Sequence, residues 1–120
     1  FYIAEIHPTA LLFENTEENA ELKLTYSYFN SGEPLRFEYQ GSYAAPDADY
    51  RSVEYGWPHS MAEIVGSLIS AGLRIEFLHE FPFTVYPMFQ GMQRGEDGYY
   101  RLTNQKVELP LLFSLRATKG

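Results

Sequence analysis

The sequence predicts an α+β domain in which mostly antiparallel strands pack around one main helix. Two observations carry this prediction: a helix followed directly by a strand at 60–80, and alternating apolar and polar residues at 22–40. A third is the aromatic content of 17%, which favours strands. The length of 120 residues suits one domain with a modest core, so we treat 1–120 as a single domain.

The first segment, FYIAEI at 1–6, reads as a strand buried on both faces because nearly all of its residues are apolar or small. His7-Pro8 ends it, since proline lacks a backbone donor. The sequence starts inside this strand and without Met, which leads us to expect a C-terminal fragment of a longer protein.

A β-hairpin is predicted at about 22–40. Apolar and aromatic residues alternate with polar ones on both sides of the turn-rich segment at 30–33. A further short strand is expected within 50–57, where Val53, Tyr55 and Trp57 alternate with other residues.

The main helix is expected at about 60–71. Ser60 has the character of an N-cap, Glu63 follows at capping-box spacing, and Gly72 supplies a left-handed stop. The apolar stripe of this helix consists of Met61, Ile64, Val65, Leu68 and Ile69. Strands at 73–79 and 109–117 complete the prediction, and the helix should lie on their sheet.

Composition argues against several classes of function. A net charge of −7 disfavours nucleic acid, and the absence of cysteine removes disulfides and thiolate chemistry. The histidines His7, His59 and His79 lack metal-ligand spacing, so no metal site is expected. No apolar run has the length of a membrane span and no signal peptide is visible, so we expect a cytoplasmic protein without membrane partners.

Candidate site residues begin at the end of the first strand. His7 stands where ligands bind in open α/β sheets, although a strand-end histidine bonded to the backbone is the alternative. Glu5 lies within the apolar strand and is either a paired structural carboxylate or part of a pocket floor.

The segment before the helix gives further candidates. Trp57 and His59 could face a ligand, because loops that lead into helix N-termini line pockets. The alternative is that Trp57 packs in the core and that His59 donates a hydrogen bond to a neighbouring carbonyl. Several tyrosines could form a pocket wall or simply pack, namely Tyr26, Tyr28, Tyr39 and Tyr55.

The order of these segments resembles the C-terminal half of a class I S-adenosylmethionine-dependent methyltransferase. The similarity runs through FYIAEIHP, WPHSMAEIVGSLISAGLRIEFLHEFP and LPLLFSLRATK. The matching positions are Leu68, Ala71, Gly72, Leu73, Ile75, Glu80, Leu109, Pro110, Phe113, Leu115, Ala117 and Lys119. The resemblance implies a Rossmann-like sheet in which the first strand is the fifth of seven, and 73–79 and 109–117 are the terminal antiparallel pair.

The resemblance also implies the function: a substrate-binding portion of a methyltransferase that acts on a small molecule. The family's glycine-rich turn and acidic cofactor residue are missing, so the chain alone should neither bind S-adenosylmethionine nor be an active enzyme. Catalytic residues are unknown, with His7 and His59 as candidate bases. The expected substrate-binding residues are Glu5, His7, Tyr55, Trp57 and His59.

Two other readings stay open: a stand-alone α+β domain that binds a small ligand or a protein, and a fragment of another Rossmann-like fold. Upstream coding sequence discriminates them, since the methyltransferase reading requires a strand, glycine turn and helix there. Without a preceding sheet the first strand has an unpaired edge, so we expect the fragment to form a homodimer.

Overall fold

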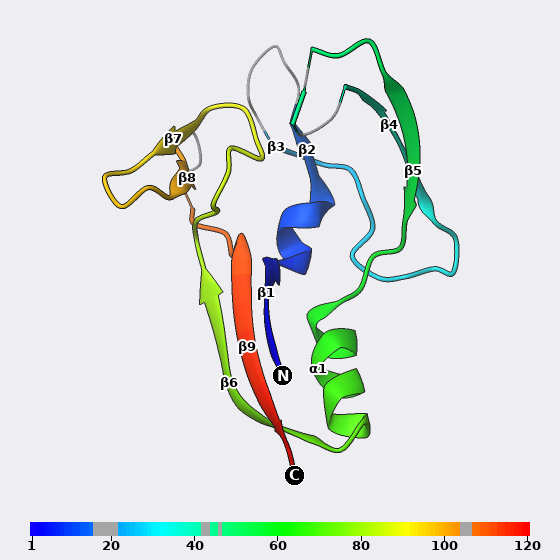
Figure 1. Ribbon diagram of the computed structural model, residues 1–120, viewed down its shortest axis with the longest axis vertical. Helices are drawn as coiled ribbons and strands as arrows, with labels where there is room; N and C mark the ends of the chain where they lie inside the picture. The colour runs from blue at the N-terminus through cyan, green and yellow to red at the C-terminus, as the bar shows by residue number, and fades with distance from the viewer. Residues whose placement is uncertain (16–21, 42–43, 46, 104–106) are drawn as a thin grey trace.

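A three-stranded sheet forms the base of the protein in the computed structural model, which describes residues 1–15, 22–41, 44–45, 47–103 and 107–120 (Figure 1). Its strands are β1 (Tyr2–Ile6), β9 (Leu112–Lys119) and β6 (Leu73–Phe81), in the order β1-β9-β6. Because β9 runs antiparallel to both neighbours, β1 and β6 are parallel to each other. The fold is therefore mixed α+β with mostly antiparallel pairing, as predicted.

The helix α1 (Met61–Ser70) covers one face of this sheet. Ser60 is the N-cap and its hydroxyl accepts from the Glu63 backbone N–H, while Gly72 has φ +85°, the left-handed conformation that glycine adopts cheaply. The apolar stripe of the helix packs against three buried residues of β9, namely Phe113, Leu115 and Ala117. Ile69 departs from the predicted stripe and is 58% exposed.

The expectation that the first strand is buried on both faces is wrong. Only Ile3 and Ile6 are half-buried, and Tyr2 is 62% exposed. Ile3 faces α1 and Ile6 packs against the core that contains Ala10 of η1, whereas Tyr2 and Ala4 are exposed. The apolar composition of this segment predicted burial on both faces, but a strand is buried on both faces only where other elements cover both sides of its sheet.

One edge of β1 has no partner strand in the described part of the chain. Phe1 exchanges two backbone hydrogen bonds with Ala117 of β9, and the His7 N–H donates to the carbonyl of Leu111, just before β9. Since pairing alternates along an antiparallel ladder, the peptide groups of Tyr2, Ala4 and Ile6 point toward the free edge. The homodimer expected through this edge stays a prediction.

A second group of short elements lies beyond the carboxyl ends of β1 and β6 (Figure 1). It consists of the 3₁₀ helix η1 (Pro8–Leu12) and the strands β2 (Phe13–Asn15), β3 (Leu22–Leu24), β4 (Leu35–Gln40), β5 (Arg51–Gly56), β7 (Met92–Arg94) and β8 (Tyr100–Leu102). They form three two-stranded ladders, β2-β3, β4-β5 and β7-β8.

The predicted hairpin at 22–40 is wrong in its pairing. The segment at 22–24 pairs with β2, and the segment at 35–40 pairs with β5. After Leu24 the chain turns back, because the backbone N–H groups of Thr25 and Tyr26 both donate to the Leu12 carbonyl. Alternation identifies strands but not their partners, and each of the two segments pairs with the strand on its other side along the chain.

The turn between β7 and β8 holds a paired carboxylate. Asp97 accepts from both terminal nitrogens of Arg101, at 3.0 and 2.7 Å, and from the Tyr99 backbone N–H. The Arg101 guanidinium first, and then the Tyr99 N–H, lower the pKa of the Asp97 carboxyl from 3.8 to about 2. The ion pair therefore persists well below the pH at which a free aspartate protonates.

We expect the Asp97 carboxyl to titrate with a midpoint of about 2 in carbon NMR. Because this folded-state pKa lies below the unfolded one, the stabilisation is fully present above pH 3.8 and is lost as the pH falls through about 2. Replacing Arg101→Gln should return the midpoint toward 3.8. Glu96→Gln should leave it in place, and a wild-type midpoint near 3.8 would contradict the pairing.

None of the helices in the described residues has both the length and the apolar character required to cross a lipid bilayer.

Candidate functional site

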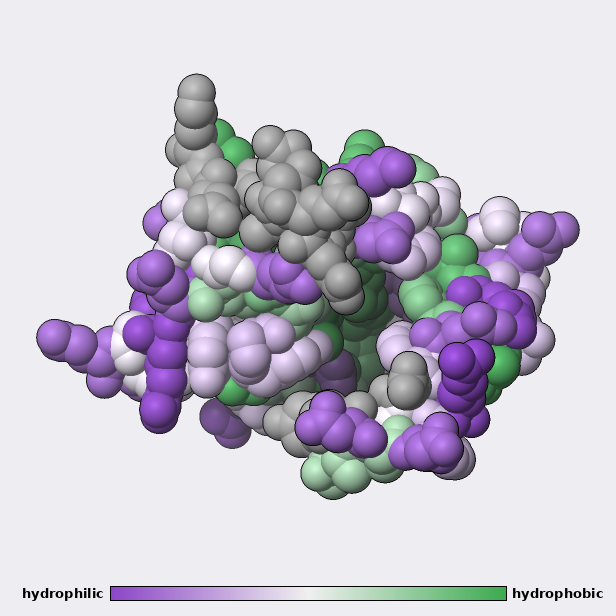
Figure 2. All heavy atoms as spheres, turned by 90° about the horizontal axis from the view of Figure 1, so that it is seen from above, coloured by the Kyte–Doolittle hydropathy of each residue, from purple (hydrophilic) through white to green (hydrophobic). Residues whose placement is uncertain are grey.

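A cavity with a largely aromatic lining, which we call the main cavity, lies at the end of the molecule beyond the carboxyl ends of β1 and β6 and has a volume of about 440 Å³. Five segments line it: η1 with β2, the segment after β3 that contains Tyr26, the β4-β5 hairpin, the loop before α1, and residues 88–89. Figure 2, which views the molecule from this end, shows a hydrophobic hollow bordered by hydrophilic side chains. A volume of this size suits a small organic molecule.

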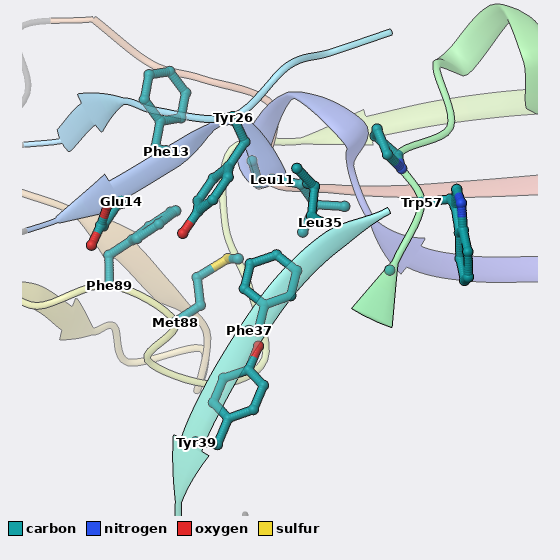
Figure 3. Close-up of a pocket in the computed structure, with 13 residues that line it drawn as sticks. Leu11, Phe13, Glu14, Tyr26, Leu35, Phe37, Tyr39, Trp57, Met88 and Phe89 are labelled. Atoms are coloured by element: carbon teal, nitrogen blue, oxygen red, sulfur yellow. The ribbon is translucent and has the colours of Figure 1, made fainter. Parts of the chain in front are cut away.

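Aromatic side chains from all five segments line this cavity (Figure 3). They are Phe13, Tyr26, Phe37, Tyr39, Trp57 and Phe89. Phe37 contacts two of the other rings. Its ring is stacked on that of Tyr39 with the centroids 6.1 Å apart, and it is tilted against that of Tyr26 with the centroids 5.5 Å apart. The alternation of β4 explains this, since Leu35, Phe37 and Tyr39 all lie on its cavity face.

The floor of the cavity is one of the two hydrophobic cores. Ala10 and Phe89 both line the cavity and both pack on Leu111, which is 1% exposed. Leu111 precedes β9, and its backbone N–H donates to the Phe81 carbonyl at the end of β6. The cavity is thereby attached directly to the central sheet.

Carboxylates stand at the border of the cavity. Glu14 of β2 is the one charged side chain among the described lining residues. Glu54 of β5 pairs with Phe37 in the hairpin register and so shares the cavity face of the hairpin. Burial, followed by the negative charge of Glu54, raises the pKa of the Tyr39 phenol above its ordinary value.

His7 has both ring nitrogens engaged. The Thr9 backbone N–H donates to Nδ1 at 3.0 Å, and Nε2 lies 2.5 Å from the Glu80 carboxylate. Since Nδ1 accepts, the proton sits on Nε2 and is donated to Glu80. The ring is 4% exposed and packs edge-on against Phe113, and it does not line the main cavity. In this arrangement neither nitrogen has a lone pair free to accept a proton from a substrate.

Trp57 and His59 lie on two different hollows. Trp57 is 49% exposed and lines the main cavity. His59 is exposed and lines a shallow groove between Phe1 and α1, where its Nδ1 lies 3.1 Å from the Glu63 carboxylate. Glu63 thus contacts His59, so only the Ser60 half of the predicted capping box forms.

Two other predicted site residues lie outside the main cavity. Tyr55 pairs with Arg36 on the outer face of the β4-β5 hairpin and is 58% exposed. Glu5 faces the α1 side of the sheet, opposite Phe113, and is exposed. Of the four tyrosines considered as pocket wall, Tyr26 and Tyr39 line the cavity.

The sequence reasoning did not single out Glu14, Phe13, Met88 or Phe89 as cavity residues. They come from two short segments, 13–14 and 88–89, that are far apart in the chain and carry no motif. The alternation of Leu35, Phe37 and Tyr39 was the one available signal, and it marked the correct face of the hairpin.

In the described part of the chain, no three histidine, aspartate or glutamate side chains lie close enough together to hold a metal ion. Comparisons with protein-family models, curated proteins and solved structures found no match for this chain. A function can therefore be proposed only from the geometry of the sheet and of the cavity.

Proposed function

We propose that this chain is the substrate-binding C-terminal portion of a cytoplasmic S-adenosylmethionine-dependent methyltransferase that acts on a small molecule. The observation that carries the proposal is the strand order β1-β9-β6. The resemblance requires 73–79 and 109–117 to be an antiparallel pair at the end of a sheet, and β6 and β9 pair in this way. It also requires the first strand to belong to a larger sheet, and the free edge of β1 is consistent with that.

The position of the cavity supports the same proposal. In open α/β sheets ligands bind beyond the carboxyl ends of the strands, and the cavity lies beyond those of β1 and β6. The cavity is apolar and aromatic, which suits an organic substrate. In the proposed enzyme these side chains bind and orient the methyl acceptor, and positioning supplies much of the catalysis of such a transfer.

The residues of this chain do not fit S-adenosylmethionine itself. The turn after β1 reads His7-Pro8-Thr9 and the turn after β6 reads Pro82-Phe83, and neither contains glycine. His7, a proposed base, is occupied by Thr9 and Glu80, and His59 lies on a separate groove. We therefore assign this chain binding and orientation of the substrate, and no cofactor contact.

A stand-alone ligand-binding domain is the alternative, because every lining residue of the cavity belongs to this chain. The two candidates differ in what the complete reading frame encodes. The methyltransferase requires an upstream strand, glycine-rich turn and helix, and its complete product must bind S-adenosylmethionine. A complete product without that binding would leave the stand-alone domain.

A further inference from the structure

We infer that the aromatic cavity takes a small organic cation, an amine or quaternary ammonium group on an apolar body. The inference rests on the proposed function only in calling this ligand the methyl acceptor. The recognition itself involves residues of this chain alone and applies equally to a stand-alone binding domain.

The lining combines π faces with one carboxylate. Six of its side chains are aromatic and the sulfur-containing Met88 adds a polarisable contact. The negative face of an aromatic ring attracts a cation, and a group of such rings is how proteins recognise quaternary ammonium compounds. Glu14 supplies the formal counter-charge, and no lysine, arginine or histidine is among the lining residues in the described part of the chain.

Two carboxylates, Glu14 and Glu54, lie beside the cavity, and one lysine stands opposite Glu14. Glu54 shares the cavity face of the hairpin, and its charge contributes to the raised pKa of the Tyr39 phenol. The nearest candidate for a counter-ion is Lys23, which is exposed and opposite Glu14 in the β2-β3 register. In the described residues no ion pair joins Lys23 to Glu14. With a net charge of −7 for the whole chain, the cavity repels anions and attracts cations.

The cavity has two chemically different ends. Figure 3 shows Glu14 at one end, grouped with Phe13, Tyr26 and Phe89, and Trp57 at the opposite end. Between them Phe37 and Met88 point into the space. This arrangement fits a ligand whose charged group lies near Glu14 and whose apolar body extends toward Trp57.

A neutral ligand would be recognised less well than a cation of the same shape. It would displace water from the exposed Glu14 carboxylate and return at most one neutral hydrogen bond, whereas a cation supplies a stronger, charge-assisted one. An anionic ligand would add direct repulsion to this cost. Charge should therefore set the affinity among ligands of equal size.

The test compares phenylbutylamine, phenylbutanol and phenylbutanoate, which share one apolar body and differ in charge. Trp57 is the only tryptophan of the sequence and lines the cavity, so its fluorescence reports binding directly. At neutral pH and low salt we expect the amine to bind about tenfold more tightly than the alcohol, and the acid to bind most weakly. Equal affinity of amine and alcohol would overturn the inference.

Two variants locate the effect. Glu14→Gln should reduce the preference for amine over alcohol to about twofold while leaving the affinity for the alcohol nearly unchanged. Glu96→Gln, which makes the same change in net charge at an exposed turn away from the cavity, should keep the full preference. A preference that survives Glu14→Gln would contradict the role of this carboxylate.

This result is separable from the proposed function. Loss of the methyltransferase assignment, through a complete product that does not bind S-adenosylmethionine, leaves the amine preference of the cavity intact. Conversely, an enzyme whose cavity treats amine and alcohol alike retains the proposed function and loses the inference.

Discussion

Replacing Phe113→Ala should lower the free energy of unfolding by about 3–5 kcal/mol. Phe113 is 1% exposed and lies on β9, between β1 and β6, where α1 packs against the same core. Removing its ring leaves a cavity that the surrounding helix and strands can fill only in part by moving inward. Urea denaturation measures the change, provided that the dependence of the unfolding free energy on urea concentration has the same slope in both proteins.

The matched control is Phe29→Ala, the same chemical change at a residue that is 69% exposed. Phe29 has an edge-to-face contact with Tyr28 at 5.0 Å and little else to lose, so its cost should stay below about 1 kcal/mol. Similar losses for the two variants would show that β9 is not the centre of the fold.

Replacing Leu111→Ala should cost about 2–5 kcal/mol and also weaken ligand binding. Leu111 is 1% exposed and supports Ala10 and Phe89, which form the floor of the aromatic cavity. The two readouts are urea denaturation and quenching of Trp57 by phenylbutylamine under conditions in which the variant remains folded. A variant with unchanged stability would contradict the packing described for this core.

Leu24→Ala is the control for this second change, because Leu24 is 69% exposed and does not line the cavity. Its stability should change by less than about 0.5 kcal/mol, and phenylbutylamine should bind as in the wild type. Reduced binding in this variant would mean that the cavity responds to general loosening of the molecule.

Local sequence signals predicted the lower half of the fold well. The helix begins after Ser60 and the chain turns at Gly72 with positive φ, because capping and left-handed turns depend on residues that are adjacent in sequence. The strands predicted at 73–79 and 109–117 are also present as β6 and β9, although β9 begins at Leu112.

Pairing and burial could not be read in the same way. The segments at 22–24 and 35–40 are extended as predicted, yet each found another partner, because strand pairing depends on contacts between distant residues. For the same reason only Trp57 of the five predicted substrate-binding residues lines the main cavity. Tyr55 lies on a strand as predicted, but its side chain is on the outer face of the hairpin, because the register pairs it with Arg36.

The central claim is that this chain supplies the substrate side of a methyltransferase whose cofactor site lies elsewhere. The most direct measurement is calorimetric titration of S-adenosylmethionine into two proteins: the 120-residue chain, and the product of the complete reading frame that encodes it. We predict no heat of binding for the chain alone and saturable binding for the complete product. Saturable binding by the chain alone, or none by the complete product, would contradict the claim.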